Sequence, residues 1–168
     1  MVTRAQPPLV AVFLGTDHHR FDRLVRWVVS LSEQGLFSFH VQHGSTPLPD
    51  GVGGSALLAP GALGDLLDRA DAVVTHGGPG SIMDAREHGH LPIVVPRDPR
   101  LGEHVDDHQQ RFARFVSRTG LVVTAYDEEE LATRLSLAVL TGHHTPTEHR
   151  VSPTLARFEA LVEDLVHR

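Results

Sequence analysis

Short apolar runs alternate along this chain with stretches whose apolar residues recur at helical spacing. The expected strands cover residues 9–14, 38–42, 56–58, 72–75, 92–95 and 121–124, and the expected helices cover residues 21–31, 62–69, 81–88, 107–117 and 128–140. Strands joined by crossover helices pair in parallel. Continuously apolar strands such as Ile93 to Val95 indicate a sheet that is covered on both faces. The pattern therefore predicts a doubly wound α/β fold.

Composition limits the possible functions. With 168 residues, of which 40% are hydrophobic and 21% charged, the chain is sized and composed for one globular domain. A net charge of −6 without a Lys/Arg cluster argues against binding to nucleic acid. The chain contains no cysteine, which excludes disulfides and suits a reducing compartment. Because no signal peptide or long apolar run is recognisable, we expect a cytoplasmic protein.

Residues 72–82 are the most informative segment, because a buried strand passes there through a glycine-rich turn into a helix. The turn contains His76, Gly77, Gly78, Gly80 and Ser81. Glycines let the backbone approach a phosphate, and the free N–H groups and dipole of a helix start attract negative charge. Since open α/β sheets bind ligands at the carboxyl ends of their strands, the turn predicts a diphosphate site.

The glycine-rich turn could also have a purely structural role. Such a turn can serve tight packing alone, and the Ser81 and Asp84 spacing fits a capping box that needs no ligand. No Gly-Lys-Ser/Thr follows, so this is not a Walker A loop. The first strand is followed by the single Gly15, which argues against a dinucleotide fingerprint.

A polar loop at residues 97–109 follows the next strand. Its polar side chains include Glu103, Asp107, His108 and Gln109. Carboxylates, amides and imidazoles suit the hydroxyls of a sugar, although a solvated loop in which Asp106 or Asp107 caps the next helix fits equally well. His104 and His108 are four residues apart, but no His-Glu-x-x-His pattern accompanies them, so we expect no metal site.

The C-terminal part is expected to form a separate unit. Residues 141–147 contain helix breakers and predict a hinge, and residues 154–166 carry an amphipathic stripe that would cover either the core or another subunit. We therefore divide the chain into a nucleotide-sugar-binding domain, residues 1–142, and a hinge with a C-terminal helix, residues 143–168.

Three segments in this order resemble a known family: HGGPGSI at 76–82, PIVVPR at 92–97 and GEHVDDHQ at 102–109. They are similar to glycosyltransferase family 28 C-terminal-domain proteins of bacterial exopolysaccharide and capsule synthesis. Gly15 and Thr16, followed by FDRL at 21–24, resemble the family's N-terminus. The chain is also similar to the catalytic subunit of the eukaryotic two-subunit dolichol-linked N-acetylglucosaminyltransferase. The resemblance implies a single Rossmann-like domain of the GT-B C-terminal type.

The same resemblance implies an activity. It predicts an inverting, metal-independent hexosyltransferase that needs no cofactor, takes a UDP-sugar as donor and acts on a lipid-pyrophosphate-linked saccharide. A membrane-anchored acceptor-binding subunit would supply the other half, so activity would require this partner and the protein would sit peripherally at the inner membrane face. The alternative is a non-catalytic nucleotide-sugar-binding or regulatory subunit, which could be a homodimer formed through residues 154–166.

The resemblance also implies roles for particular residues. The expected donor-binding residues are Gly15, Thr16, His76, Gly77, Gly78, Gly80, Ser81, Asp84, Glu103, Asp107, His108 and Gln109. Gly77, Gly78, Gly80 and Ser81 would hold the diphosphate. Asp84 would bind the ribose, and His108 with Gln109 would face the sugar. Asp84 stands where the family usually has Glu. No catalytic base is assigned, and His18 and His19 in the first βα loop are the candidates.

Overall fold

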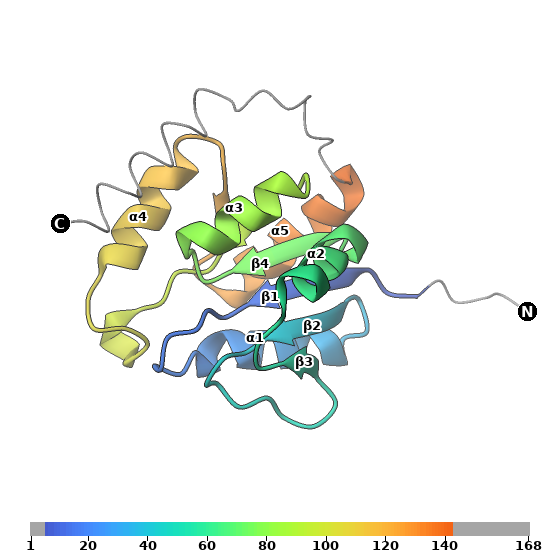
Figure 1. Cartoon of the computed structure of the whole chain (residues 1–168), viewed down its shortest axis with the longest axis horizontal. Coiled ribbons are helices and arrows are strands. Elements are labelled where there is room, and N and C mark those ends of the chain that lie inside the picture. Colours follow the sequence, from blue (N-terminus) through green and yellow to red (C-terminus); the bar gives the residue numbers. More distant parts are fainter. Residues whose placement is uncertain (1–5, 143–168) are drawn as a thin grey trace, which may run out of the picture.

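The computed structural model describes residues 6–142, and it contains one sheet of six parallel strands with helices between them (Figure 1). The strands are β1 (Leu9–Phe13), β2 (Ser38–Gln42), β3 (Gly53–Ser55), β4 (Ala72–Thr75), β5 (Ile93–Val94) and β6 (Val123–Thr124). The helices are α1 (Asp22–Glu33), α2 (Pro60–Arg69), α3 (Pro79–Glu87), α4 (His108–Ser117) and α5 (Glu128–Thr141), with a 3-10 turn at Pro99–Leu101. The predicted α/β fold class is confirmed.

The strand order is β3-β2-β1-β4-β5-β6, which is the order of a Rossmann-like sheet. From β1 the chain first builds outward through β2 to β3, then returns to place β4 on the other side of β1. The loops after β1 and β4 consequently leave the sheet side by side and in opposite directions. This switch point is where open α/β sheets bind their ligands.

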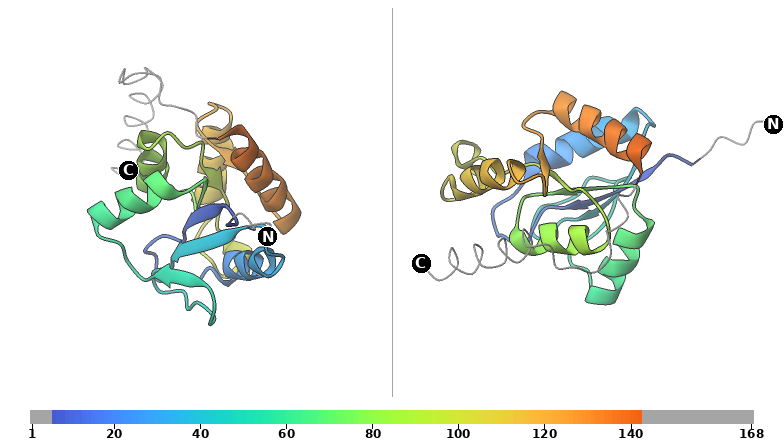
Figure 2. Two further views of the ribbon diagram at one scale, coloured as in Figure 1. Left: turned by 90° about the vertical axis from the view of Figure 1, so that its right-hand side faces the viewer. Right: turned by 90° about the horizontal axis from the view of Figure 1, so that it is seen from above.

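Helices cover both faces of the sheet (Figure 2). On one face, α1 and α5 bury Leu24, Val28 and Leu131 against the strands. On the other, α2 and α3 pack against β1 and β4, while α3 and α4 enclose a cluster with Val94 of β5. All four residues of β4 are buried, as a strand covered on both sides requires.

The expected strand at residues 56–58 was wrong, because β3 lies three residues earlier. β3 pairs in parallel with His40–Gln42 of β2, and a Cβ on Gly54 would lie 2.5 Å from the Val41 carbonyl oxygen. This close approach favours glycine on the edge strand. Beyond the end of β3, the Ala56 carbonyl oxygen still accepts a hydrogen bond from the Gly44 N–H, but Leu57 is 66% exposed.

The proposed capping box of Ser81 and Asp84 was also wrong. Helix α3 begins at Pro79, with Gly78 as its N-cap, so Ser81 lies inside the first turn. Proline fits the first helical position because its missing N–H would have no partner there.

At the other end of the described chain, α5 continues to Thr141 and is capped by Gly142. The rest of the predicted hinge and the helix expected at 154–166 lie outside the described residues. No helix in the part that the structure describes is long and apolar enough to cross a bilayer.

Candidate functional site

The loops after β1 and β4 form one pocket at the switch point of the sheet. Its lining residues are Phe13, Gly15, Thr16, Gln42, His76, Gly78, Pro79, Gly80 and Ser81. Gly15 and Thr16, which precede the glycine-rich turn by about 60 positions, thus share a surface with it. The structure brings together six of the predicted donor-binding residues: Gly15, Thr16, His76, Gly78, Gly80 and Ser81.

The electrostatic character of this pocket comes from the backbone. Pro79 is the first residue of α3, so the N–H groups of Gly80 and Ser81 point out of the first turn without partners inside the helix. The positive end of the helix dipole adds to their effect. No residue with a permanently charged side chain appears among the described residues that line the pocket. The arrangement suits an anion that carries its own charge, such as a diphosphate.

The His76 imidazole is wedged between two glycines. A Cβ on Gly15 would lie 2.8 Å from its Nε2 atom, and a Cβ on Gly78 would lie 2.4 Å from the same atom. Only glycine at both positions leaves enough room for the His76 ring between the two loops. His76 Nδ1 lies 3.3 Å from the Phe13 carbonyl oxygen, which ties the ring to the end of β1. His76 therefore sets the distance between the two pocket loops.

Burial and the nearby Arg97 guanidinium lower the pKa of His76 to about 4. The ring is therefore neutral at physiological pH, because both effects disfavour its protonated form.

Gly77 shapes the turn without lining the pocket. It is buried with a φ of +95°, its N–H donates to Thr75 Oγ1 at 3.2 Å, and a Cβ would lie 2.9 Å from a methyl group of Val94. A side chain at this position would meet both backbone strain and a clash.

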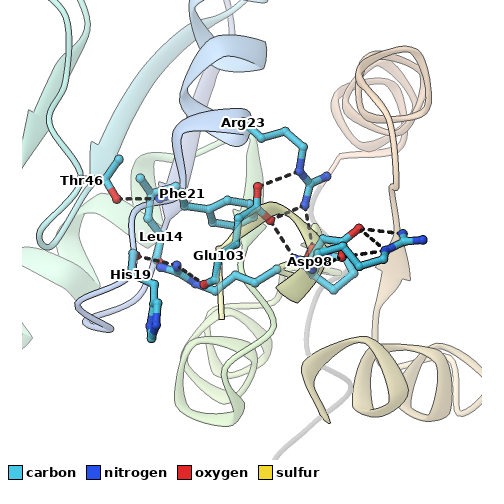
Figure 3. A network of polar contacts seen from close by, with 10 residues as sticks. Leu14, His19, Phe21, Arg23, Thr46, Asp98 and Glu103 are labelled. Carbon is cyan, nitrogen blue, oxygen red and sulfur yellow. Dashed lines mark hydrogen bonds and ion pairs between the residues drawn. The ribbon is translucent and has the colours of Figure 1, made fainter. Parts of the chain in front are cut away.

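Arg97 is a buried cation whose hydrogen bonds reach the backbone of Leu14 and His19, both of which are labelled in Figure 3. Its guanidinium donates to the carbonyl oxygens of Leu14 at 2.6 Å, His19 at 2.7 Å and Glu103 at 3.0 Å, and it lies over the Phe21 ring. A charge can be buried when hydrogen bonds replace its water. Arg97 thereby fixes the backbone of the β1–α1 loop against the loop after β5.

Glu103, one of the predicted donor-binding residues, is part of the same network. Its carboxylate accepts two hydrogen bonds from Arg23, at 3.0 and 2.9 Å, and one from the Asp98 N–H at 2.7 Å. Glu103 is 3% exposed. The structure thus gives this carboxylate a positioning role, and in this conformation it is not accessible to a bound sugar.

The remaining predicted residues do not line the pocket. Asp84 lies within α3, and His108 is the exposed first residue of α4. Asp107 is the N-cap of α4, but its carboxylate pairs with Arg111 at 3.1 Å and does not cap the helix. It is Asp106 that accepts a hydrogen bond from the His108 N–H. Gln109 Oε1 is buried without a hydrogen-bond partner in the described part of the chain.

A family model now identifies the domain. The model described as the glycosyltransferase family 28 C-terminal domain matches residues 62–165, a stretch that includes the glycine-rich turn and the polar loop. The chain belongs to this glycosyltransferase family.

The curated relative that this family 28 domain matches is a longer protein. The L-demethylnoviosyl transferase of Streptomyces niveus is 30% identical over 164 residues, which cover 89% of the family 28 chain and 40% of that relative. The chain thus spans about two fifths of the length of the curated relative that it matches.

Solved structures show the same fold. The glycotransferase of kitacinnamycin matches with a TM-score of 0.59 at 19% identity, covering 98% of this chain and 43% of that one. Arabidopsis thaliana UGT89C1, complexed with UDP, matches with a TM-score of 0.54 at 15% identity, and the match covers 98% of this chain and 40% of that one. ALG13 matches with a TM-score of 0.56 at 19% identity, covering 97% of this chain and 98% of that one. The family 28 domain has the fold of GT-B C-terminal domains.

The sequence interpretation missed several residues around this site. Gln42 lines the pocket from the end of β2, and its place as a polar residue that ends a strand was the available signal. Arg23 and Arg97 resemble ordinary surface arginines in sequence, and no local pattern marks them as buried. The contact of His104 Nε2 with Asp17, at 3.5 Å, joins two loops that the sequence had not connected.

Proposed function

We propose that this chain is the donor-binding, catalytic subunit of a two-component UDP-sugar glycosyltransferase. It transfers a hexose to a lipid-pyrophosphate-linked saccharide in exopolysaccharide or capsule synthesis. The observation that carries the proposal is the pocket at the switch point, which Gly15, His76 and Gly78 line together with the first turn of α3.

The pocket is suited to hold the diphosphate without a metal ion. The N–H groups of Gly80 and Ser81 and the α3 dipole oppose the negative charge, and they also favour the charge that grows on the leaving diphosphate as the glycosidic bond breaks. In the proposed reaction the acceptor oxygen attacks the anomeric carbon from the face opposite the nucleotide, so the configuration inverts.

The acceptor half is not part of this domain. Residues 6–142 build one Rossmann-like domain, whereas the two-fifths coverage of the relatives shows that those proteins contain a further part. We propose that a membrane-anchored subunit supplies this part and holds the complex at the inner membrane face. The match with ALG13 over nearly the whole of both chains supports a single-domain subunit of this kind.

Ligand-dependent stabilisation tests the donor. UDP should raise the melting temperature of the isolated protein more than ADP, GDP or NAD in the presence of EDTA, because a ligand that binds only the folded form stabilises it. Thymidine diphosphate belongs in the panel, since a structure of this fold holds it. A preference for ADP or NAD would contradict the donor assignment. A preference for thymidine diphosphate would replace UDP with thymidine diphosphate as the nucleotide of the donor.

Turnover tests the enzyme. Transfer from UDP-sugar to a lipid-linked acceptor should require the membrane-anchored subunit. If the protein binds UDP-sugar but supports no turnover with any acceptor subunit, it is the non-catalytic or regulatory subunit.

A further inference from the structure

We propose that His19, oriented by Asp17, is the general base that takes the proton from the acceptor hydroxyl. This inference rests on the proposed function and extends it. The donor-binding chain would then supply the base as well as the nucleotide site.

The two side chains form a short, directed pair. Asp17 Oδ1 lies 2.6 Å from His19 Nδ1 and also accepts the His19 backbone N–H at 2.7 Å. With the Nδ1 proton on this hydrogen bond, the lone pair of a neutral imidazole is on Nε2. The His19 side chain is 22% exposed, so it is partly open to solvent. An imidazole held by a carboxylate in this way is the arrangement of a general base and its orienting group.

The backbone that carries the pair is fixed from both sides. The His19 carbonyl oxygen accepts the 2.7 Å hydrogen bond from the buried Arg97, and the Asp17 carbonyl oxygen accepts one from Ser45 Oγ at 2.9 Å. In Figure 3 the His19 ring points away from Glu103. Because the backbone of the pair is held at these two points, the imidazole would need little reorganisation before it accepts a proton.

The pair lies beside the donor pocket. Asp17 directly follows Thr16, a lining residue, and the Asp17 charge is close enough to act on the pKa of His76 between the pocket glycines. A base in the β1–α1 loop therefore borders the site of the transferred sugar, and the acceptor would approach across this loop.

Several charged groups face His19 from other elements. Burial raises the pKa of the Asp17 carboxyl, but hydrogen bonds from His19 and the Arg97 charge together lower it below its usual value, so Asp17 stays ionised. His104 Nε2 lies 3.5 Å from the other Asp17 oxygen, and Asp106 in turn lies 3.4 Å from His104.

The neighbouring His18 is a weaker candidate. It is 86% exposed and 3.6 Å from Asp17, so the carboxylate does not hold it in one orientation.

The proton and electron balance of the step is simple. Nε2 takes the acceptor proton while the acceptor oxygen forms its bond to the anomeric carbon. The bond from that carbon to the β-phosphate oxygen breaks, and its electron pair leaves with UDP. His19 becomes an imidazolium, which the ionised Asp17 stabilises.

Transfer by the complex with its acceptor subunit tests the proposal. His19→Ala should lower kcat by about 10²–10⁴-fold while UDP affinity, measured by calorimetry on the same preparation, stays at the wild-type value. Added imidazole should restore part of this activity, because it can replace the missing base. Asp17→Asn should also lower kcat and should not respond to imidazole. The matched control is His88→Ala, since His88 Nδ1 makes an equal 2.6 Å contact with Asp68 far from the pocket.

Other results would overturn the inference while leaving the donor site intact. Wild-type kcat in His19→Ala, or a loss confined to His18→Ala, would assign the base elsewhere. Equal loss of UDP affinity in His19→Ala would make His19 a donor ligand. Activity that chelation abolishes and a divalent cation restores would make Asp17, His18 and His19 a metal site, as their ligand atoms lie within 4.8 Å of one another. Loss of UDP binding by the wild type would instead refute the proposed function.

Discussion

Arg23 and Glu103, 80 positions apart in the chain, form a two-point ion pair in which both side chains are largely buried. The pair joins α1 to the loop after β5, and Arg23 also donates to the Pro96 carbonyl oxygen. Because Arg97 lies in that same loop and holds the β1–α1 loop, the ion pair supports the geometry of the pocket from a distance.

Glu103→Gln should therefore destabilise the protein by about 3 kcal/mol or more, because a buried Arg23 would lose its counter-charge. Urea unfolding at pH 7 measures the loss. Arg100→Gln is the control, since the Arg100–Asp98 pair has an 83% exposed arginine side chain and should contribute little. Similar stability of Glu103→Gln and wild type would show that the network does not support the fold.

Gly78→Ala and Gly80→Ala should separate the two functions of the glycine-rich turn. Alanine at 78 would collide with His76, so stability and UDP affinity should both fall. Gly80 has open space around it, and alanine there should stabilise α3 by up to about 1 kcal/mol while weakening UDP binding, because its methyl group would meet the diphosphate. Thermal unfolding and calorimetry measure the two effects. Unchanged UDP affinity in Gly80→Ala would place the diphosphate elsewhere.

His76 should make stability depend on pH. Its pKa is lowered from the ordinary 6.5 to about 4 in the folded protein, so the unfolded chain binds more protons between these values. The contribution of the neutral His76 ring to the free energy of unfolding should therefore be fully present above pH 6.5. It should decrease as the pH falls towards 4, by at most about 3 kcal/mol. In urea titrations, the free energy of unfolding of His76→Asn should decrease less from pH 7 to pH 5 than that of the wild type. The exposed His18→Asn should show the same decrease as the wild type. Parallel pH curves for wild type and His76→Asn would contradict the assignment.

Asp84→Ala should affect ligand binding more than stability. Asp84 does not cap α3, so the change in unfolding free energy should stay within about 0.5 kcal/mol. If its carboxylate binds the ribose, wild type should prefer UDP to 2′-deoxy-UDP and the variant should lose that preference. Asp84→Glu, which restores the usual family residue, should keep it. Equal discrimination by all three proteins would remove Asp84 from the site.

Gln109→Ala should lower affinity for UDP-sugar and the transfer rate while leaving affinity for free UDP unchanged. The buried Gln109 Oε1 has no partner among the described residues, and a donor sugar hydroxyl would supply one. One hydrogen bond is worth about 0.5–1.5 kcal/mol, which corresponds to roughly a tenfold change at most. Calorimetry with both ligands measures the difference, with the neighbouring Gln110→Ala as control. Unchanged UDP-sugar affinity and transfer rate would leave Gln109 without a role in sugar binding.

Local patterns in the sequence were sufficient to predict most of the fold. Runs such as Ala72 to Thr75 identify buried strands because apolar residues at every position fit a covered sheet, and Asp127 before Glu128 marks a helix start that its side chain caps. Local patterns did not predict the edge strand β3. Gly53 and Gly54 have low β propensity, and glycine is favoured there because the backbone of β2 lies so close.

The sequence by itself thus determined the α/β architecture and the glycine-rich turn at 76–82 between β4 and α3, because periodicity and turn chemistry depend on neighbouring residues. Only the tertiary structure decided that Gly15 and Gly78 enclose His76, that Glu103 is buried with Arg23, and that Asp17 orients His19 beside the pocket. These arrangements arise from the strand order, which places the ends of β1 and β4 together. The physical reason is that burial of a charge and the spacing of two loops depend on segments about 60 to 80 residues apart, whose contacts form only when the sheet assembles.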